Sequence, residues 1–369
     1  MQDSAPSSAP DEFVLAWSEL CRELQRVGEQ ILSSPPGVLS PLDKAEGIRY
    51  LTRLTRGAFE SYIEGNDAKA PLFRRAVHET LKFGMDNPDN VYLLAPVNGK
   101  YDYRISGHRG TVRYLGFGSQ SGGTGKNGEL QSTGYLKSSD MQVEADGTFS
   151  ITASAQPQPG NWLPMTAVTR LIQVRQTRLD HVTEKLPSIT IERIDGSESP
   201  RLLCPEHLPA ALKRAIDFIG GTATFFQDWT ERFRQQANRL PRFDPALALR
   251  AGGDPNIAYY HGYFELTDDE ALVVEFEPPS CEYWNFQLAN YWLESLDYRY
   301  FPVHLNQHSA AVSADGWVRI VIAQRDPGVS NWLNTCGHNH GTMCLRWVGA
   351  AHHPDPIVTI KPCKALHHE

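Results

Sequence analysis

Histidine and cysteine side chains gather in one short segment near the end of the chain. Cys336, His338 and His340 alternate with Gly337 and Asn339, so on an extended strand they would point to one face, because side chains alternate along a strand. Imidazole and thiolate groups are good zinc ligands. The glycine and asparagine neighbours favour a loop, however, and no carboxylate stands at a spacing that would complete a site. We therefore predict no bound metal and no other cofactor.

A second pair of histidines, His304 and His308, follows Asp297 closely. A carboxylate and an imidazole within reach of one substrate can transfer protons, and imidazole is the side chain best suited to this near neutral pH. We predict that His304, His308 and His338 are catalytic acids or bases. Asp297 completes the predicted catalytic set by orienting one of them.

An aromatic-rich run over residues 281–287 has the alternation of a strand. Its tyrosine, asparagine and glutamine would share one face and present polar groups beside aromatic walls, as small-molecule pockets do. The alternative is a core role, which is usual for Tyr and Trp on a β-sandwich, with the charged residues that follow paired only to each other. The predicted substrate-binding residues are Tyr283, Asn285, Gln287, Tyr298, Arg299 and His340.

The chain also repeats a longer pattern. Residues 145–175 and 314–346 both open with Ala-Asp-Gly, pass a Pro/Gly turn, reach Asn-Trp-Leu and end an apolar run in arginine. The spacings of these features agree to within one residue. Self-similarity of this kind indicates a duplicated unit.

Residues that both copies share are expected to hold the fold. On this argument Arg175 and Arg346 are structural, and Trp162 and Trp332 are core residues beside a turn. After Asn-Trp-Leu, where the first copy is largely apolar, the second has the histidine-rich segment that includes His338. Function is therefore expected in the second copy.

Segments with helical spacing of apolar residues alternate with segments rich in strand signals. Residues 11–33, 43–62 and 206–238 are predicted to be helical, and 91–194 and 259–360 to form short antiparallel strands. The predicted fold is α+β and β-dominated, with two tandem antiparallel jelly-roll-like β-sandwiches, each preceded by helices.

The predicted division of the chain follows from this alternation. A disordered arm covers residues 1–10, and helices plus the first sandwich cover 11–197. Helices plus the second, functional sandwich cover 198–369.

Three stretches resemble the domain-of-unknown-function 1214 family, which is often found with the 1254 domain: residues 86–111, 283–299 and 325–347, the second of which is YWNFQLANYWLESLDYR. The resemblance implies β-sandwich domains of jelly-roll type, which the strand pattern favours independently. It implies no particular reaction, because the family has no established general one. Function must therefore be argued from the site.

Composition excludes several kinds of partner. The chain is 41% hydrophobic and 21% charged, with a formal net charge of −8, so nucleic acid is not an expected partner. No run approaches about 18 consecutive apolar residues, so we expect no membrane partner. The start of the chain lacks a secretory signal, and six cysteines are sparse for this length. Reduced thiols and a cytoplasmic location are therefore predicted.

The sequence favours an enzyme. We expect acid–base chemistry, hydrolysis or elimination, on a small and partly apolar organic substrate in a pocket of the second sandwich or between the two. One alternative is a jelly-roll protein that binds a carbohydrate or other small ligand without reaction, and another is a structural assembly module. The expected partner is thus a small molecule, and a homo-oligomer is left open.

Overall fold

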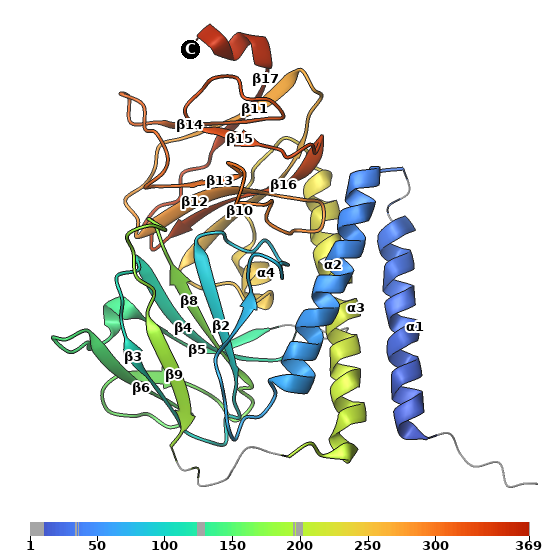
Figure 1. Ribbon diagram of the computed structural model, residues 1–369. Coiled ribbons are helices and arrows are strands. Elements are labelled where there is room, and N and C mark those ends of the chain that lie inside the picture. Colours follow the sequence, from blue (N-terminus) through green and yellow to red (C-terminus); the bar gives the residue numbers. More distant parts are fainter. Residues whose placement is uncertain are drawn as a thin grey trace, which may run out of the picture.

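The computed structural model describes residues 11–33, 35, 37–123, 130–194, 196 and 202–368. Figure 1 shows two β-sandwiches, one from each half of the chain, with long helices along one side. The α+β, β-dominated fold with two tandem sandwiches is therefore confirmed. The predicted arm over 1–10 and the predicted boundary at 197/198 lie outside the described residues.

The first sandwich pairs a five-stranded sheet with a four-stranded one. In spatial order, the larger sheet contains β1 (Arg74–Val77), β2 (Asn90–Pro96), β8 (Leu171–Thr177), β4 (Tyr114–Ser121) and β5 (Gln131–Lys137). The smaller sheet contains β7 (Trp162–Pro164), β6 (Thr148–Ser154), β3 (Tyr103–His108) and β9 (Ser188–Arg193).

The second sandwich pairs two four-stranded sheets. One contains β10 (Ile257–Glu265), β16 (His340–Val348), β12 (Tyr283–Ala289) and β13 (His304–Asn306). The other contains β15 (Trp332–Asn334), β14 (Val318–Ala323), β11 (Glu270–Phe276) and β17 (Ile357–Pro362).

The two topologies correspond strand by strand once β1 is set aside. The order β2-β8-β4-β5 matches β10-β16-β12-β13, and β7-β6-β3-β9 matches β15-β14-β11-β17. Among the described strands, the pairings are antiparallel except β6 with β7 and β14 with β15, which are parallel in both copies. The repeat in the sequence is thus a repeat of the fold.

The Asn-Trp-Leu motif makes the same contacts in both copies. The Asn331 amide donates to the carbonyls of Ala311 (2.7 Å) and Arg319 (3.0 Å) and accepts from the Ala311 N–H (2.8 Å). Asn161 makes the three matching bonds in the first sandwich. The motif therefore ties a short parallel strand to a neighbouring loop.

The sequence predicts that the tryptophans of this motif are core residues, and this prediction is wrong. Trp162 and Trp332 are only half-buried, and each indole N–H donates to a backbone carbonyl at 3.0 Å. Leu163 and Leu333 are the fully buried residues. Because neighbouring side chains of a strand point to opposite faces, the leucine and the tryptophan cannot both enter the core.

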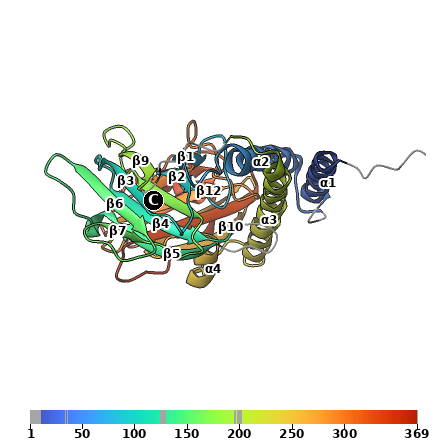
Figure 2. The ribbon, with the colours of Figure 1, turned by 90° about the horizontal axis from the view of Figure 1, so that it is seen from below.

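The three long helices form one bundle: α1 (Glu12–Ser33), α2 (Pro41–Phe59) and α3 (Leu208–Arg234). Figures 1 and 2 show them together on one side of the molecule, and the short helix α4 (Pro245–Arg250) lies apart from them. Their shared hydrophobic cluster includes Tyr291 and Trp292 of the second half. Helices α1 and α2 belong to the first half, yet they pack with the second sandwich. None of the described helices has the length and apolar character needed to cross a membrane.

We expect Leu333→Ala to lower the free energy of unfolding by about 2–5 kcal/mol, because it removes a fully buried side chain. Val182→Ala is the control, since Val182 is 91% exposed and such changes stay within about 0.5 kcal/mol. Urea unfolding followed by fluorescence measures both. Equal losses in the two variants would contradict this account of the core.

Candidate active site between the two sandwiches

Residues of both sandwiches meet at one buried carboxylate, that of Asp89. Asp89 stands directly before β2, and His181 lies in the loop after β8. His304 begins β13, and Tyr283 begins β12. Nε2 of His181 lies 2.8 Å and Nε2 of His304 3.3 Å from Oδ1 of Asp89, and the Tyr283 hydroxyl donates to Oδ2 at 2.6 Å.

The surroundings of Asp89 stabilise its charged form. Burial alone would raise the pKa of this carboxyl, but the hydrogen bonds from His181, His304 and Tyr283 outweigh burial and hold the pKa well below its ordinary value of 3.8. Burial and the Asp89 charge raise the pKa of Tyr283, so its phenol stays protonated. The cluster therefore presents a fixed negative charge to two imidazoles.

A polar pocket of about 490 Å³ opens beside this cluster. Three arginines, His181 and Tyr298 are among its lining residues. Arg75 pairs with Glu79 and Arg299 with Asp297, whereas Arg178 has no carboxylate within ion-pair distance in the described part of the chain. The Arg178 Nε is buried and unpartnered there as well. Arg178 is therefore suited to bind an anionic group.

The other copy of the fold shows what is special about His304. Arg175 of β8 lies opposite Gly116 of β4, and Arg346 of β16 opposite Asn285 of β12, so these positions correspond. By the same register His304, opposite Gln287, corresponds to Tyr135, opposite Gly118. Tyr135 also binds a buried carboxylate, since its hydroxyl donates to Asp254 at 2.6 Å.

The two equivalent clusters differ in their capacity for proton transfer. Burial and the charge of Asp254 raise the pKa of Tyr135 far above the ordinary value of a phenol, so this group keeps its proton. The corresponding imidazole of His304 belongs to the side-chain type suited to gain and lose a proton near neutral pH. Of the two equivalent positions, the one in the second sandwich therefore places an imidazole beside a buried carboxylate, and the one in the first places a phenol there.

Two predicted catalytic residues lie outside this cluster. Asp297 does not orient a histidine, because it forms a two-pronged pair with Arg299, with distances of 2.8 and 2.7 Å. The His308 ring is largely exposed and lies 3.9 Å from the Asp180 carboxylate. The carboxylate that holds His304 is instead Asp89, more than two hundred positions earlier in the chain.

His338 and His340 contact helix α2, which begins at a capping box between Ser40 and Asp43. Nε2 of His338 lies 2.9 Å from Glu46, and Nε2 of His340 lies 2.9 Å from Asp43. Both carboxylates come from one turn of the helix. The structure thus separates these two histidines from His304 and uses them to hold α2 against the second sandwich.

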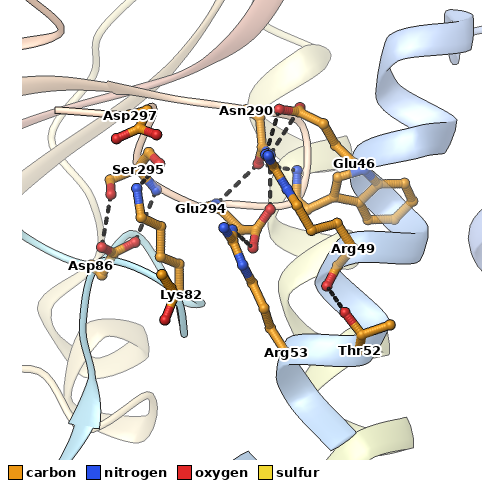
Figure 3. Close-up of polar contacts among 12 residues, drawn as sticks. Glu46, Arg49, Thr52, Arg53, Lys82, Asp86, Asn290, Glu294, Ser295 and Asp297 are labelled. Atoms are coloured by element: carbon orange, nitrogen blue, oxygen red, sulfur yellow. Dashed lines mark hydrogen bonds and ion pairs between the residues drawn. The ribbon is translucent and has the colours of Figure 1, made fainter. Parts of the chain in front are cut away.

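A buried polar network continues from Glu46, as Figure 3 shows. The Asn290 amide donates to both Glu46 and Glu294 at 3.0 Å, and Arg53 pairs with Glu294 at 2.5 Å. Burial raises the pKa of Glu294. Because its groups are already bound to one another, this network supports α2 and leaves few groups free for a substrate.

The predicted polar face of β12 exists and points at the first sandwich. Beside Tyr283, the Asn285 amide donates to Asn87 at 3.0 Å and the Gln287 amide to the Asp86 carbonyl at 2.8 Å. These side chains are fully buried. They therefore position the segment that carries Asp89.

Sequence reasoning missed Asp89 and His181. Asp89 lies in the segment DNPDN, directly before a strand and inside one of the stretches that resembles a known family. That placement was the available signal. His181 lies in an irregular loop outside the repeated motif, and nothing in its local sequence marks it.

Among the described residues, two groups have the donors to hold a metal ion: Asp89 with His181 and His304, and Asp43 with Glu46 and His338. In each, one donor atom per residue lies within 4.8 Å of the others. In the first group, no described protein group bonds the second ring nitrogen of either histidine, which metal-binding histidines usually require. In the second, Asp43 is already engaged by the capping box. Cys336 belongs to neither group.

We expect the purified protein to contain no stoichiometric zinc. In one donor set the second ring nitrogens of the histidines have no protein partner among the described residues, and in the other Asp43 is already bound in the capping box. Elemental analysis after dialysis measures this. About one zinc per chain, lost in His181→Ala, would contradict the expectation and place the metal at Asp89. Loss in His338→Ala would place it at α2.

The contact between His338 and Glu46 should make stability depend on pH. Burial opposes protonation of His338, but the hydrogen bond and charge of Glu46 outweigh burial and raise the pKa above its ordinary 6.5. The contribution is therefore complete below about pH 6.5 and is lost as pH rises through the raised pKa. We expect Glu46→Gln to destabilise the protein more at pH 5.5 than at pH 8.5.

Thermal unfolding at the two pH values measures this difference. Glu60→Gln is a matched control, because Glu60 forms an exposed pair with Arg56 near the end of the same helix. A larger loss at pH 8.5 than at pH 5.5 for Glu46→Gln would show that His338 is not charged in the folded protein.

The described arrangement defines a protein of two tandem, duplicated β-sandwiches with a polar site between them. A crystal structure of an uncharacterized protein from Burkholderia cenocepacia is 46% identical, with a TM-score of 0.93, and the match covers 95% of this chain and 97% of that one. This chain belongs to the same family as that protein.

A more distant likeness shows the fold alone. The VPA0106 protein of Vibrio parahaemolyticus is 10% identical with a TM-score of 0.51, covering 85% of this chain and 98% of that one. No family model matches the chain, and no curated protein does. The assignment to the domain-of-unknown-function 1214 family therefore stays a prediction.

Proposed function

We propose that this protein is an enzyme that transfers protons on a small organic anion bound beside Asp89. The observation that carries the proposal is one buried carboxylate contacted by two imidazoles, one of which lines a pocket of about 490 Å³. That volume is within the range of small-molecule sites.

Asp89 has the role of a positioning group. A buried carboxylate that binds one ring nitrogen of a histidine fixes the tautomer and stabilises the imidazolium that forms. Here Asp89 contacts Nε2 of both His181 and His304. The Nδ1 atoms of the two rings are therefore left to exchange protons with a substrate. The ring centroids of His181 and His304 lie 6.2 Å apart. One imidazole can therefore accept a proton while the other donates one.

The pocket favours a negatively charged substrate, because Arg178 lines it without a carboxylate partner in the described part of the chain. In a hydrolysis, one histidine would take a proton from water as it attacks, and the other would protonate the leaving group. In an elimination, one histidine would take a proton from the carbon next to the substrate's own carboxylate. The other histidine would again protonate the leaving group. The proposal covers both, so the class is hydrolase or lyase.

Further parts of the proposal rest on the sequence. Membership of the domain-of-unknown-function 1214 family is supported by the DNPDN segment, which supplies Asp89. A cytoplasmic location is supported by six cysteines that are all free thiols. The lack of nucleic-acid and membrane partners stays a prediction, and a homo-oligomer stays open.

A panel of anionic esters and β-substituted carboxylic acids tests the proposal. For any compound turned over, we expect His304→Tyr to lower kcat by about a hundredfold or more, because acid–base catalysis contributes about 10²–10⁴. Tyr135→Phe is the matched control at the equivalent position of the first sandwich and should change kcat little. His308→Ala is a second control on the surface.

Two outcomes would contradict the proposal. Turnover that survives in His304→Tyr and in His181→Ala would place the chemistry elsewhere. Compounds that bind beside Arg178, shown by weaker binding in Arg178→Gln, without turnover of any would favour the alternative of a protein that binds small ligands without reaction.

A further inference from the structure

A second cavity, of about 130 Å³, lies between the two sandwiches and helices α3 and α4. Two arginines line it, Arg175 of β8 and Arg346 of β16, and they are only 6% and 4% exposed. Aromatic side chains from the helical side, including Phe226 and Trp229, complete the wall. The cavity therefore combines buried positive charge with an apolar surface.

The arginines occupy equivalent positions of the two copies. Arg175 lies opposite Tyr92 in the pairing of β2 with β8, and Arg346 lies opposite Tyr259 in the pairing of β10 with β16. Both tyrosines also line the cavity. The two sandwiches thus present the same Tyr–Arg pair to a common space.

Neither guanidinium has a carboxylate within ion-pair distance among the described residues. Arg346 donates to the Gln287 side chain (2.6 Å) and the Met85 carbonyl (2.6 Å), and Arg175 donates to the Gly252 carbonyl. These partners are neutral. A buried charge is costly unless an opposite charge compensates it, so the cavity favours an anion.

The nearby acidic groups are engaged elsewhere. Asp254 lies close enough to act on the charge of Arg175, but its carboxylate accepts hydrogen bonds from Tyr114, Tyr135 and Asn256. Asp86 lines the cavity, and both of its oxygens bind Ser295. Neither acid therefore replaces a ligand at the two guanidiniums.

Three polar atoms of the lining residues are buried and without a partner in the described structure: His261 Nδ1, Gln173 Oε1 and Asn90 Oδ1. The His261 ring is stacked between Phe233 and Tyr259. Burial and the charge of Arg346 lower the pKa of His261 to about 3, so the His261 ring is neutral. Buried polar groups are rarely left unpaired in proteins. A carboxylate only accepts hydrogen bonds, so it would pair with Nδ1 of His261 when that nitrogen carries the ring proton, and not with the two amide oxygens.

We propose that this cavity binds a small organic carboxylate, held by Arg175 and Arg346 with its short apolar part against the aromatic wall. Guanidinium groups match a carboxylate in shape and charge. A cavity of about 150 Å³ holds one benzene molecule in another protein, so a ligand of roughly six heavy atoms fits here. This binding does not depend on the function proposed for Asp89.

Titration calorimetry of the full chain with butyrate tests the proposal. Butyramide has the same shape without the charge, and inorganic phosphate is an anion without the apolar part. We expect one butyrate per chain and at least about tenfold weaker binding of both other compounds, because hydrogen bonds to charged groups contribute about 1.5–3 kcal/mol. Equal binding of butyramide, tighter binding of phosphate, or no butyrate binding would overturn it.

Variants locate the binding site. Arg346→Gln and Arg175→Gln should each weaken butyrate binding at least about tenfold, while Arg319→Gln, on the surface and paired with Asp315, should not. Ala251→Leu would fill the cavity from the end of α4 without removing a charge, so it tests the site even if the arginine variants fail to fold. Unchanged butyrate binding in Ala251→Leu would show that the ligand binds elsewhere.

Discussion

From equivalent positions of the two sandwiches, one arginine of each donates a hydrogen bond to a backbone carbonyl of the other half of the chain. The rest of the interface depends on this reciprocal contact. Arg346 donates to the carbonyl of Met85 at 2.6 Å, and Arg175 donates to that of Gly252. Met85 and Gly252 both have positive φ, 59° and 80°. For Met85 this conformation is unfavourable and persists only where the surroundings fix it. The N–H of Met85, bound to Leu293 O at 2.7 Å, helps to do so.

The same contact sets the position of the candidate active site. From Met85 to Asp89 the chain is bound at nearly every residue by β12 and β16 of the other sandwich, through Arg346, Gln287 and Tyr283. The Asp89 carboxylate is therefore placed by the second sandwich although it belongs to the first half of the chain. His304 comes from β13, next to β12 in the same sheet. A shift of one sandwich against the other would separate the carboxylate from this imidazole.

Local patterns predicted the sandwiches but not how they pack. Alternation along β12 placed Tyr283, Asn285 and Gln287 on one face, and the repeated Asn-Trp-Leu motif predicted equivalent strands. The partners of these groups lie far away in sequence, since His338 meets Glu46 and His304 meets Asp89. A carboxylate nearby in sequence, Asp297, was assigned instead, and it pairs with Arg299. Long-range pairing of this kind leaves no local spacing to detect.

The division between shared and single-copy residues does not separate fold from function where the two sandwiches meet. Two copies that contact each other reciprocally bring equivalent residues to the same space, so a shared side chain occurs there twice. Arg175 and Arg346, which we assigned to the fold because both copies have them, line one cavity together. Away from this space each copy meets different neighbours, and Tyr135 and His304 differ at equivalent positions. The proposed carboxylate site thus comes from residues that the copies share, and the proposed catalytic site from a position where they diverge.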